Sequence, residues 1–280
     1  MNPPGVDSDD LLVRSRSALL DALEALEAHR DAVIVIGAQA VYLRTARSPV
    51  ALAEATKDSD LALDPRELDD DPRVEEAMSR AGFRPSDDGQ PGAWRNPEGI
   101  PVDLMVPEAL AGAGGRTARA ARIPPHDRRV ARRARGLEAA VVDNSLMSVP
   151  ALDPADPRDY RVKVAGPAAL LVAKLHKIGE RAGNPTRLND KDAHDVYRIL
   201  IGVQTAELAS AFEVLRADPT SGAATGKAVE HLSVLFAAGP GALGSEMAGR
   251  AEEGIGEPET VALASSVLAD DLLQALRPGP

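Results

Sequence analysis

The chain has 280 residues, of which 44% are hydrophobic and 27% are charged. This length and apolar content are enough to bury a core in one large domain or two smaller ones, and they exclude a low-complexity or collagen-like chain. The absence of cysteine excludes disulfide frameworks and cysteine metal sites. The N-terminal segment lacks the basic and apolar regions of a signal peptide, and no apolar run is long enough to span a membrane. We therefore expect a cytoplasmic protein with no membrane partner.

Charge is distributed unevenly along the chain. The net charge of -11 argues against a general nucleic-acid-binding protein. Residues 116–135, called the arginine segment below, nevertheless carry eight arginines and one acid, a local net charge of +7. The segment is either a solvated helix face or a surface that contacts the phosphates of a structured RNA, since few aromatic residues are available to stack on single-stranded bases. The candidate RNA contacts are Arg128, Arg129, Arg132 and Arg133.

Helices and strands alternate in the first part of the chain. Ser8 is a good N-cap for the first helix, the β-branched run before Gly37 is typical of a buried strand, and the alternation after Asp58 is typical of a half-buried one. In chain order we expect a helix over 8–29, a strand over 32–36, a helix over 38–45, a strand over 58–63, a helix from Pro72 to about Gly82, turns over 85–99, a strand over 101–106, a helix over 126–136, and strands over 138–149 and 159–164.

The pattern changes near Pro167, after which every predicted element is a helix. The expected helices cover 167–182, 189–201, 205–217, 221–237 and 259–276. The sequence therefore predicts two domains, a mixed α and β domain over 1–165 and a helical domain over 166–280.

Three features of the first domain indicate chemistry on phosphates. A strand ends at Gly37-Ala38, where the start of a helix offers free backbone N–H groups to a phosphate. Asp58 and Asp60 are two residues apart in the next strand, so both should project from the same face. Asp103 lies between apolar neighbours in a third strand, where a carboxylate is rarely buried without a partner.

Three converging carboxylates would suit a magnesium site. Asp58, Asp60 and Asp103 would supply the oxygen ligands that Mg²⁺ prefers, with Mn²⁺ as an alternative ion. Close carboxylates repel one another, and a cation between them relieves that repulsion. Metal ions held in this way can activate an attacking hydroxyl group and stabilise a leaving pyrophosphate. For an isolated Asp-x-Asp pair, exposed acids at a strand edge would be the simpler interpretation.

The ordered set of motifs resembles the minimal nucleotidyltransferase fold and, more narrowly, the AbiEii-like toxin nucleotidyltransferases that include the MenT toxins. The similarity covers roughly residues 30–201 and depends on the segments VIVIGAQAVYL, TKDSDLAL, VDLMV, AKLHKIGERAG and KDAHDVYRIL. Two departures are Ala38, where that family usually has glycine or serine, and the long spacing of 21 positions from Gly37 to Asp58. The resemblance implies an α+β fold, with a nucleotidyltransferase-like mixed sheet and flanking helices followed by a helical domain that contributes lysine and aspartate side chains to the active-site cleft.

The resemblance also implies roles for individual residues. Catalytic roles fall on Asp58, Asp60, Asp103, Lys174, Asp192 and Asp195. Nucleotide contacts fall on Gly37, Ala38, Thr56, Lys174 and Lys177, with Thr56 also a candidate for regulatory phosphorylation. The simpler interpretations are a solvated basic face for the lysines and helix capping for Asp192 and Asp195. Either of these two acids could belong to the site, and Arg181 could pair with either.

The implied function is a magnesium-dependent enzyme that transfers a nucleoside monophosphate from an NTP to the 3′ end of tRNA. The implied role is that of a growth-inhibiting toxin with a separate antitoxin protein as partner. A protein from a different class, a catalytically silent nucleotidyltransferase-like fold that binds nucleotide or RNA, is one alternative. Another is an enzyme that acts on a protein or small-molecule hydroxyl group. The three acids favour an enzyme, and the arginine segment favours RNA over a small molecule.

Overall fold

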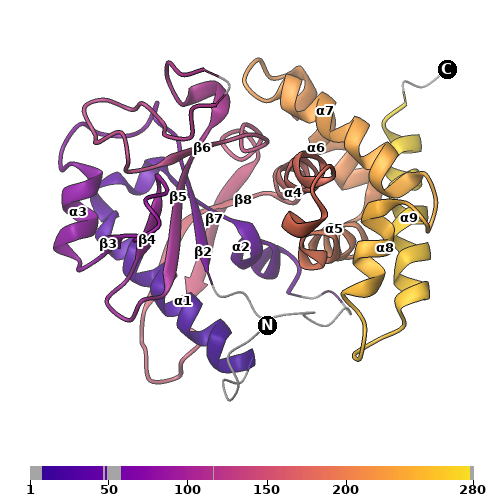
Figure 1. Ribbon diagram of the computed structural model, residues 1–280, viewed down its shortest axis with the longest axis horizontal. Helices are drawn as coiled ribbons and strands as arrows, with labels where there is room; N and C mark the ends of the chain where they lie inside the picture. Colours follow the sequence, from indigo (N-terminus) through magenta and orange to yellow (C-terminus); the bar gives the residue numbers. More distant parts are fainter. Residues whose placement is uncertain (1–7, 47, 49–57, 116, 278–280) are drawn as a thin grey trace. The chain divides into compact units, whose positions relative to one another are not determined.

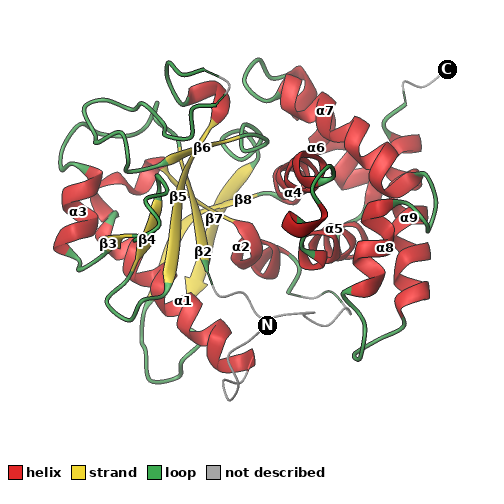
Figure 2. Cartoon of the chain, viewed as in Figure 1, coloured by secondary structure: helices red, strands yellow, loops and turns green. Residues whose placement is uncertain are grey.

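The computed structural model describes residues 8–46, 48, 58–115 and 117–277, and it has the predicted α+β architecture (Figure 1). A mixed sheet with flanking helices is followed by a helical region, which stands out in the colouring by secondary structure (Figure 2). By their internal contacts the described residues fall into two compact units. The sheet unit comprises 8–40, 58–115, 117–134 and 144–165, and the helical unit comprises 41–46, 48, 135–143 and 166–277.

The sheet places strands from distant parts of the sequence next to one another. Its order is β3-β4-β5-β2-β1-β8-β7, with β6 also paired to β5. The β1–β8, β2–β5 and β5–β6 pairs are parallel and the remaining pairs are antiparallel, so the sheet is mixed as expected. The strands are β1 (Val33–Ile36), β2 (Ser59–Leu63), β3 (Arg84–Pro85), β4 (Ala93–Arg95), β5 (Pro101–Pro107), β6 (Arg132–Ala134), β7 (Asn144–Pro150) and β8 (Asp159–Ala165).

Helix α1 (Ser8–Ala25) covers one face of the sheet, where it packs against β2 and β5 (Figure 1). Leu19 and Leu20 are fully buried on this helix. The helix ends four residues before the predicted limit, and a 3₁₀ segment, η1 (Glu27–Ala32), leads into β1. The other helical elements that begin in the sheet unit are α2 (Gly37–Arg44), α3 (Val74–Arg80) and η2 (Glu108–Leu110).

The helical unit packs around the aromatic side chains Phe212 and Phe236, both of which are fully buried. Its elements are α4 (Pro167–Arg181), η3 (Pro185–Arg187), α5 (Asp190–Gly202), α6 (Thr205–Ala217), α7 (Gly222–Leu232), the π-helical η4 (Ser233–Ala237), α8 (Leu243–Arg250) and α9 (Pro258–Ala275). Across the described part of the chain, none of the helices has the combination of length and apolar character needed to cross a bilayer.

The helix predicted over 126–136 is wrong, because this stretch turns and then forms β6. The Arg133 N–H donates to the Arg119 carbonyl at 2.9 Å, the Ala121 N–H donates to the Ala131 carbonyl at 3.0 Å, and Arg132 pairs with Met105 of β5. Hydrogen bonds from both sides therefore satisfy this backbone in an extended form. Such long-range pairing overrides the local helix propensity of arginine and alanine.

Four further elements differ from the prediction. Strands β3 and β4 occur within or beside the 85–99 segment expected to be turns, and Trp94 of β4 is buried with its indole N–H donating to the Val130 carbonyl at 3.0 Å. Strand β7 begins at Asn144, after a stretch of turns, instead of near residue 138. Helix α8 was not predicted, because it is short and contains Gly244 and Gly249, and glycine is a poor helix former.

Candidate active site

Two of the predicted acids lie side by side on neighbouring strands. Asp60 of β2 and Asp103 of β5 are direct register partners in a parallel pair. Adjacent strands are about 4.8 Å apart, and register partners point to the same face. The two carboxylates therefore project together, which is the arrangement that the strand prediction required.

Two further predicted site residues, Asp58 and Thr56, come before β2 in the chain. Asp58 is exposed and lies one residue before the strand begins. Its separation of two residues from Asp60 is compatible with a shared face, and its place in the site stays a prediction. Thr56 lies outside the described residues.

A glycine turn lies directly against the Asp60 carboxylate. Strand β1 ends at Ile36, the register partner of Asp60, and Gly37 follows with φ +68°. A side chain at Gly37 would be strained at this φ and would overlap the Oδ2 atom of Asp60, so the position requires glycine. Ala38 comes next in the first turn of α2, where backbone N–H groups have no acceptor within the helix. The turn thus places anion-binding groups beside a carboxylate.

Asp103 is held by an arginine that the sequence did not assign to this site. The Nη2 atom of Arg132 on β6 lies 2.8 Å from Oδ2 of Asp103, and the Arg132 side chain is half-buried. Strand β6 pairs with the same edge of β5 that β4 uses, which brings the arginine to the acid. The guanidinium neutralises one of the two neighbouring carboxylates and so reduces their mutual repulsion.

The carboxylates present suit a magnesium ion that is also bound by substrate phosphates. Among the described residues, no three histidine, aspartate or glutamate side chains converge closely enough to hold a metal ion by themselves. Magnesium, however, is usually bound through one or two carboxylates together with substrate phosphates. Asp60 and Asp103, with the Gly37 turn against Asp60, provide that combination of oxygen ligands and a phosphate cradle. The residues present therefore fit a metal that arrives with a nucleotide.

In the helical unit, the predicted lysine and acids form one buried ion cluster. The Nζ atom of Lys174 on α4 lies 2.9 Å from Asp192 and 2.6 Å from Asp195, both on α5. Lys177 also contacts Asp192 at 2.9 Å. Arg181 lies 3.6 Å from Asp192, so it is Asp192 with which Arg181 pairs. Both acids therefore share Lys174 as a partner.

The charges in this cluster are stabilised by one another. Burial would lower the pKa of Lys174, but the carboxylates of Asp192 and Asp195 outweigh it and raise the pKa well above its usual range. Burial would likewise raise the pKa of Asp192, but Lys174 and Lys177 hold it below the usual range. Lys174 is almost wholly buried, whereas the Lys177 side chain is 42% exposed. Of the two lysines, Lys177 is thus the one that can meet a ligand from solvent.

The four arginines predicted to contact RNA divide into two pairs. Arg128 and Arg129 are exposed. Arg132 is engaged with Asp103, and Arg133 donates from Nη2 to the carbonyl oxygens of Ala111 and Gly112. Of these four arginines, Arg128 and Arg129 are therefore the two most available to a phosphate.

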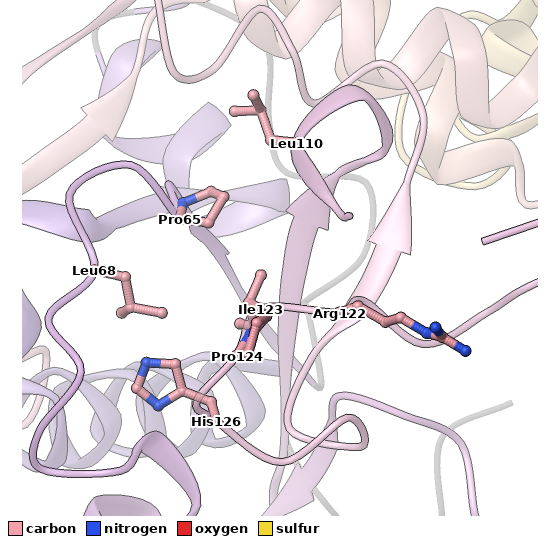
Figure 3. Close-up of a pocket in the computed structure, with 7 residues that line it drawn as sticks. All are labelled: Pro65, Leu68, Leu110, Arg122, Ile123, Pro124 and His126. Atoms are coloured by element: carbon pink, nitrogen blue, oxygen red, sulfur yellow. The ribbon is translucent and has the colours of Figure 1, made fainter. Parts of the chain in front are cut away.

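A pocket in the sheet unit lies away from the acids. It has a volume of about 190 Å³ and is lined mainly by apolar side chains, with Pro65, Leu68 and His126 facing one another (Figure 3). Arg122 also lines it, but its side chain points away from those three in Figure 3. Pro65 follows the last residues of β2, whereas Asp60 lies at the start of that strand. The pocket is thus separate from the carboxylate pair.

The comparisons with known proteins agree with this geometry at the level of family. A sequence model described as nucleotidyltransferase matches residues 14–216, whereas no curated protein matches the chain. Among solved structures, JHP933 from Helicobacter pylori is similar with 13% identity and a TM-score of 0.41, covering 95% of this chain and 93% of its own. A candidate nucleotidyltransferase from H. pylori has 10% identity and a TM-score of 0.35, covering 95% and 96%. Scores this low add nothing to the assignment, which depends on the family match. Since that match covers well over half of its length, the chain belongs to the nucleotidyltransferase family.

Proposed function

We propose that the chain transfers a nucleoside monophosphate from an NTP to a hydroxyl acceptor in a magnesium-dependent reaction. The observation that carries the proposal is the pairing of Asp60 with Asp103 in register, with the Gly37 turn packed against the Asp60 carboxylate. This places oxygen ligands for a cation next to backbone groups that bind phosphate. Both are needed by the same substrate, a magnesium–NTP complex.

In the proposed reaction, the acceptor oxygen forms a bond to the α-phosphorus of the NTP. The bond from that phosphorus to the oxygen that bridges to the β-phosphate breaks, and pyrophosphate leaves with the electron pair. The hydroxyl proton passes to a nearby base, for which Asp58 and Asp60 are the candidates. Asp103 suits the role of base less well, because Arg132 competes for one of its oxygens. Positioning and charge neutralisation supply most of the rate gain in phosphoryl transfer.

Magnesium, or manganese in its place, would neutralise charge on the phosphates when it is bound with the nucleotide. Asp60 and Asp103 would hold it together with the phosphates of the substrate. The Gly37 turn and the first turn of α2 would orient the triphosphate. In the helical unit, Lys177 and Arg181 are the cations suited to binding phosphate. Lys174 would act indirectly, because its ion pair fixes the Asp192 carboxylate that both of them contact.

The proposed acceptor is the 3′ end of tRNA, as the resemblance to the AbiEii-like toxins implies. The exposed Arg128 and Arg129 are compatible with backbone contacts to a structured RNA. The toxin role, the cytoplasmic location and the antitoxin partner belong to this proposal and depend on the same resemblance.

The test is incubation of the protein with each of the four α-³²P-labelled NTPs, Mg²⁺, and either total RNA or purified tRNA. Label in the tRNA band, absent with EDTA, is the expected result. Label in a protein would indicate that the acceptor is a protein hydroxyl group instead of tRNA. The ion pair between Arg132 and Asp103 would suit a silent nucleotide-binding fold, and this second function would be indicated by NTP binding without any transfer of label.

Replacing both Arg128 and Arg129 by glutamine is expected to raise the KM for tRNA while leaving the KM for NTP unchanged. Each lost phosphate contact should also lower the slope of log K against log salt by about 0.7–0.9. Arg84→Gln, at another exposed arginine of the sheet unit, is the matched control. Unchanged tRNA affinity and salt dependence in the double variant would place the RNA surface elsewhere.

A further inference from the structure

Arg16 is a buried cation whose hydrogen-bond acceptors are both neutral. It lies on α1 with 4% of its surface exposed. Its Nε atom donates to Oε1 of Gln39 at 2.9 Å, and its Nη1 atom donates to the carbonyl of Pro150 at 2.8 Å. Burial lowers the pKa of this guanidinium, which reflects the cost of keeping a charge from water. An apolar side chain could fill such a position at lower cost.

The arginine is part of a network that fixes the start of α2. Gln39 is fully buried two residues after Gly37, and its amide Nε2 donates to Oγ of Ser15 at 2.8 Å. Both ends of the Gln39 amide are therefore bound by consecutive residues of α1. The first turn of α2, which follows the glycine turn, cannot rotate or shift without breaking these bonds.

The same segment of α1 also holds the strand that carries the acids. The Ser59 hydroxyl donates to the Ser15 carbonyl at 2.8 Å. Ser59 lies between Asp58 and Asp60, and neighbouring strand residues point to opposite faces. The hydrogen bond to α1 therefore fixes the start of β2 on one face of the sheet, while Asp60 projects from the opposite face.

We propose that Arg16 is a positioning residue for nucleotide binding, which acts through Gln39 to hold the Gly37 turn in fixed relation to Asp60. The inference depends on the proposed function, in which that turn binds the triphosphate. Ser15 and Ser59 complete this hydrogen-bond network. One short stretch of α1 therefore sets the distance between the Gly37 turn and Asp60. No contact between Arg16 and the substrate is involved.

The test is steady-state kinetics of Arg16→Met, Arg16→Lys and Arg14→Met, with thermal unfolding measured in parallel. Arg14 is the matched control, since it lies on the same helix and has only a 4.0 Å approach to Glu98. For Arg16→Met, kcat/KM for the NTP should fall about 10- to 100-fold, mostly through a higher KM, because misplacement of about 1 Å can cost that much. The KM for the RNA acceptor should not change, and Arg16→Lys should recover part of the loss.

Two outcomes would overturn the inference while leaving the proposed function intact. One is a folded Arg16→Met protein with a wild-type KM for the NTP. The other is an equal loss for NTP and RNA acceptor, which a merely structural role would give. If Arg16→Met does not fold, Ser15→Ala removes the bond from the Gln39 amide with a smaller change and should raise the KM for NTP alone. Failure of the proposed function itself would be visible in the wild type, as absence of transfer.

Discussion

Replacing Asp60 by asparagine is expected to lower kcat/KM for nucleotidyl transfer by at least about 10²-fold, the usual cost of losing one electrostatic contact to a transition state. Asparagine keeps the size of the side chain and its fit against Gly37, but it removes the negative charge that holds the metal. The measurement is the initial rate of label transfer from α-³²P-NTP, with circular dichroism to confirm an unchanged fold.

Asp87→Asn is the matched control for this substitution, because Asp87 is an exposed acid of the same unit far along the chain from the carboxylate pair. Asp103→Asn should also reduce activity, and it releases Arg132 from its ion pair. A folded Asp60→Asn protein with wild-type turnover would contradict the assignment of Asp60 as a metal ligand.

Replacing Lys174 by methionine is expected to lower the free energy of unfolding by about 3–5 kcal/mol, because it leaves buried carboxylates without their shared cation. Lys174 lies within 3 Å of both Asp192 and Asp195. Lys177→Met is the control, since its more exposed pair should contribute less than about 1 kcal/mol. Urea unfolding of the two variants, monitored by circular dichroism, provides the comparison.

The pH dependence of the same experiment has a defined sign. The lowered pKa of Asp192 gives stability that is present above the ordinary aspartate pKa of about 3.9 and is lost as the pH falls through the lower, folded-state value. The raised pKa of Lys174 gives stability that is complete below about pH 10 and is lost in more alkaline solution. The difference in unfolding free energy between the wild type and Lys174→Met should therefore be constant between these two pH limits. A Lys174→Met protein as stable as the wild type would exclude the buried ion cluster.

Much of the fold follows from local sequence patterns. The β-branched run before Gly37, the alternation around Asp60 and the apolar residues around Asp103 predicted β1, β2 and β5. Helix α6 begins and ends where its apolar spacing predicts. Amphipathic periodicity is strong in such segments, and their hydrogen bonds are satisfied either within the helix or by a neighbouring strand.

The features that local patterns missed all depend on distant partners. Strand β6 exists because β5 and the 119–121 backbone satisfy its hydrogen bonds, and neither partner is evident from the arginine-rich sequence. The same pairing brings Arg132 to Asp103, so a residue expected on an RNA surface proves to be a partner of a candidate catalytic acid. The Arg16–Gln39 bond joins residues 23 positions apart and has no local signal at all. Sequence spacing thus predicted the candidate acids Asp60 and Asp103, whereas Arg132, the cation beside Asp103, could be located only from the fold.

The most direct test of the paired-carboxylate site is Mn²⁺ binding, measured by electron paramagnetic resonance with and without a non-hydrolysable α,β-methylene NTP. Two carboxylates alone should bind the ion weakly, and the nucleotide phosphates should complete the site. We expect tight Mn²⁺ binding only when the nucleotide is present, and its loss in the Asp60→Asn/Asp103→Asn double variant. Undiminished nucleotide-dependent Mn²⁺ binding in a folded double variant would show that the metal and the NTP are held elsewhere.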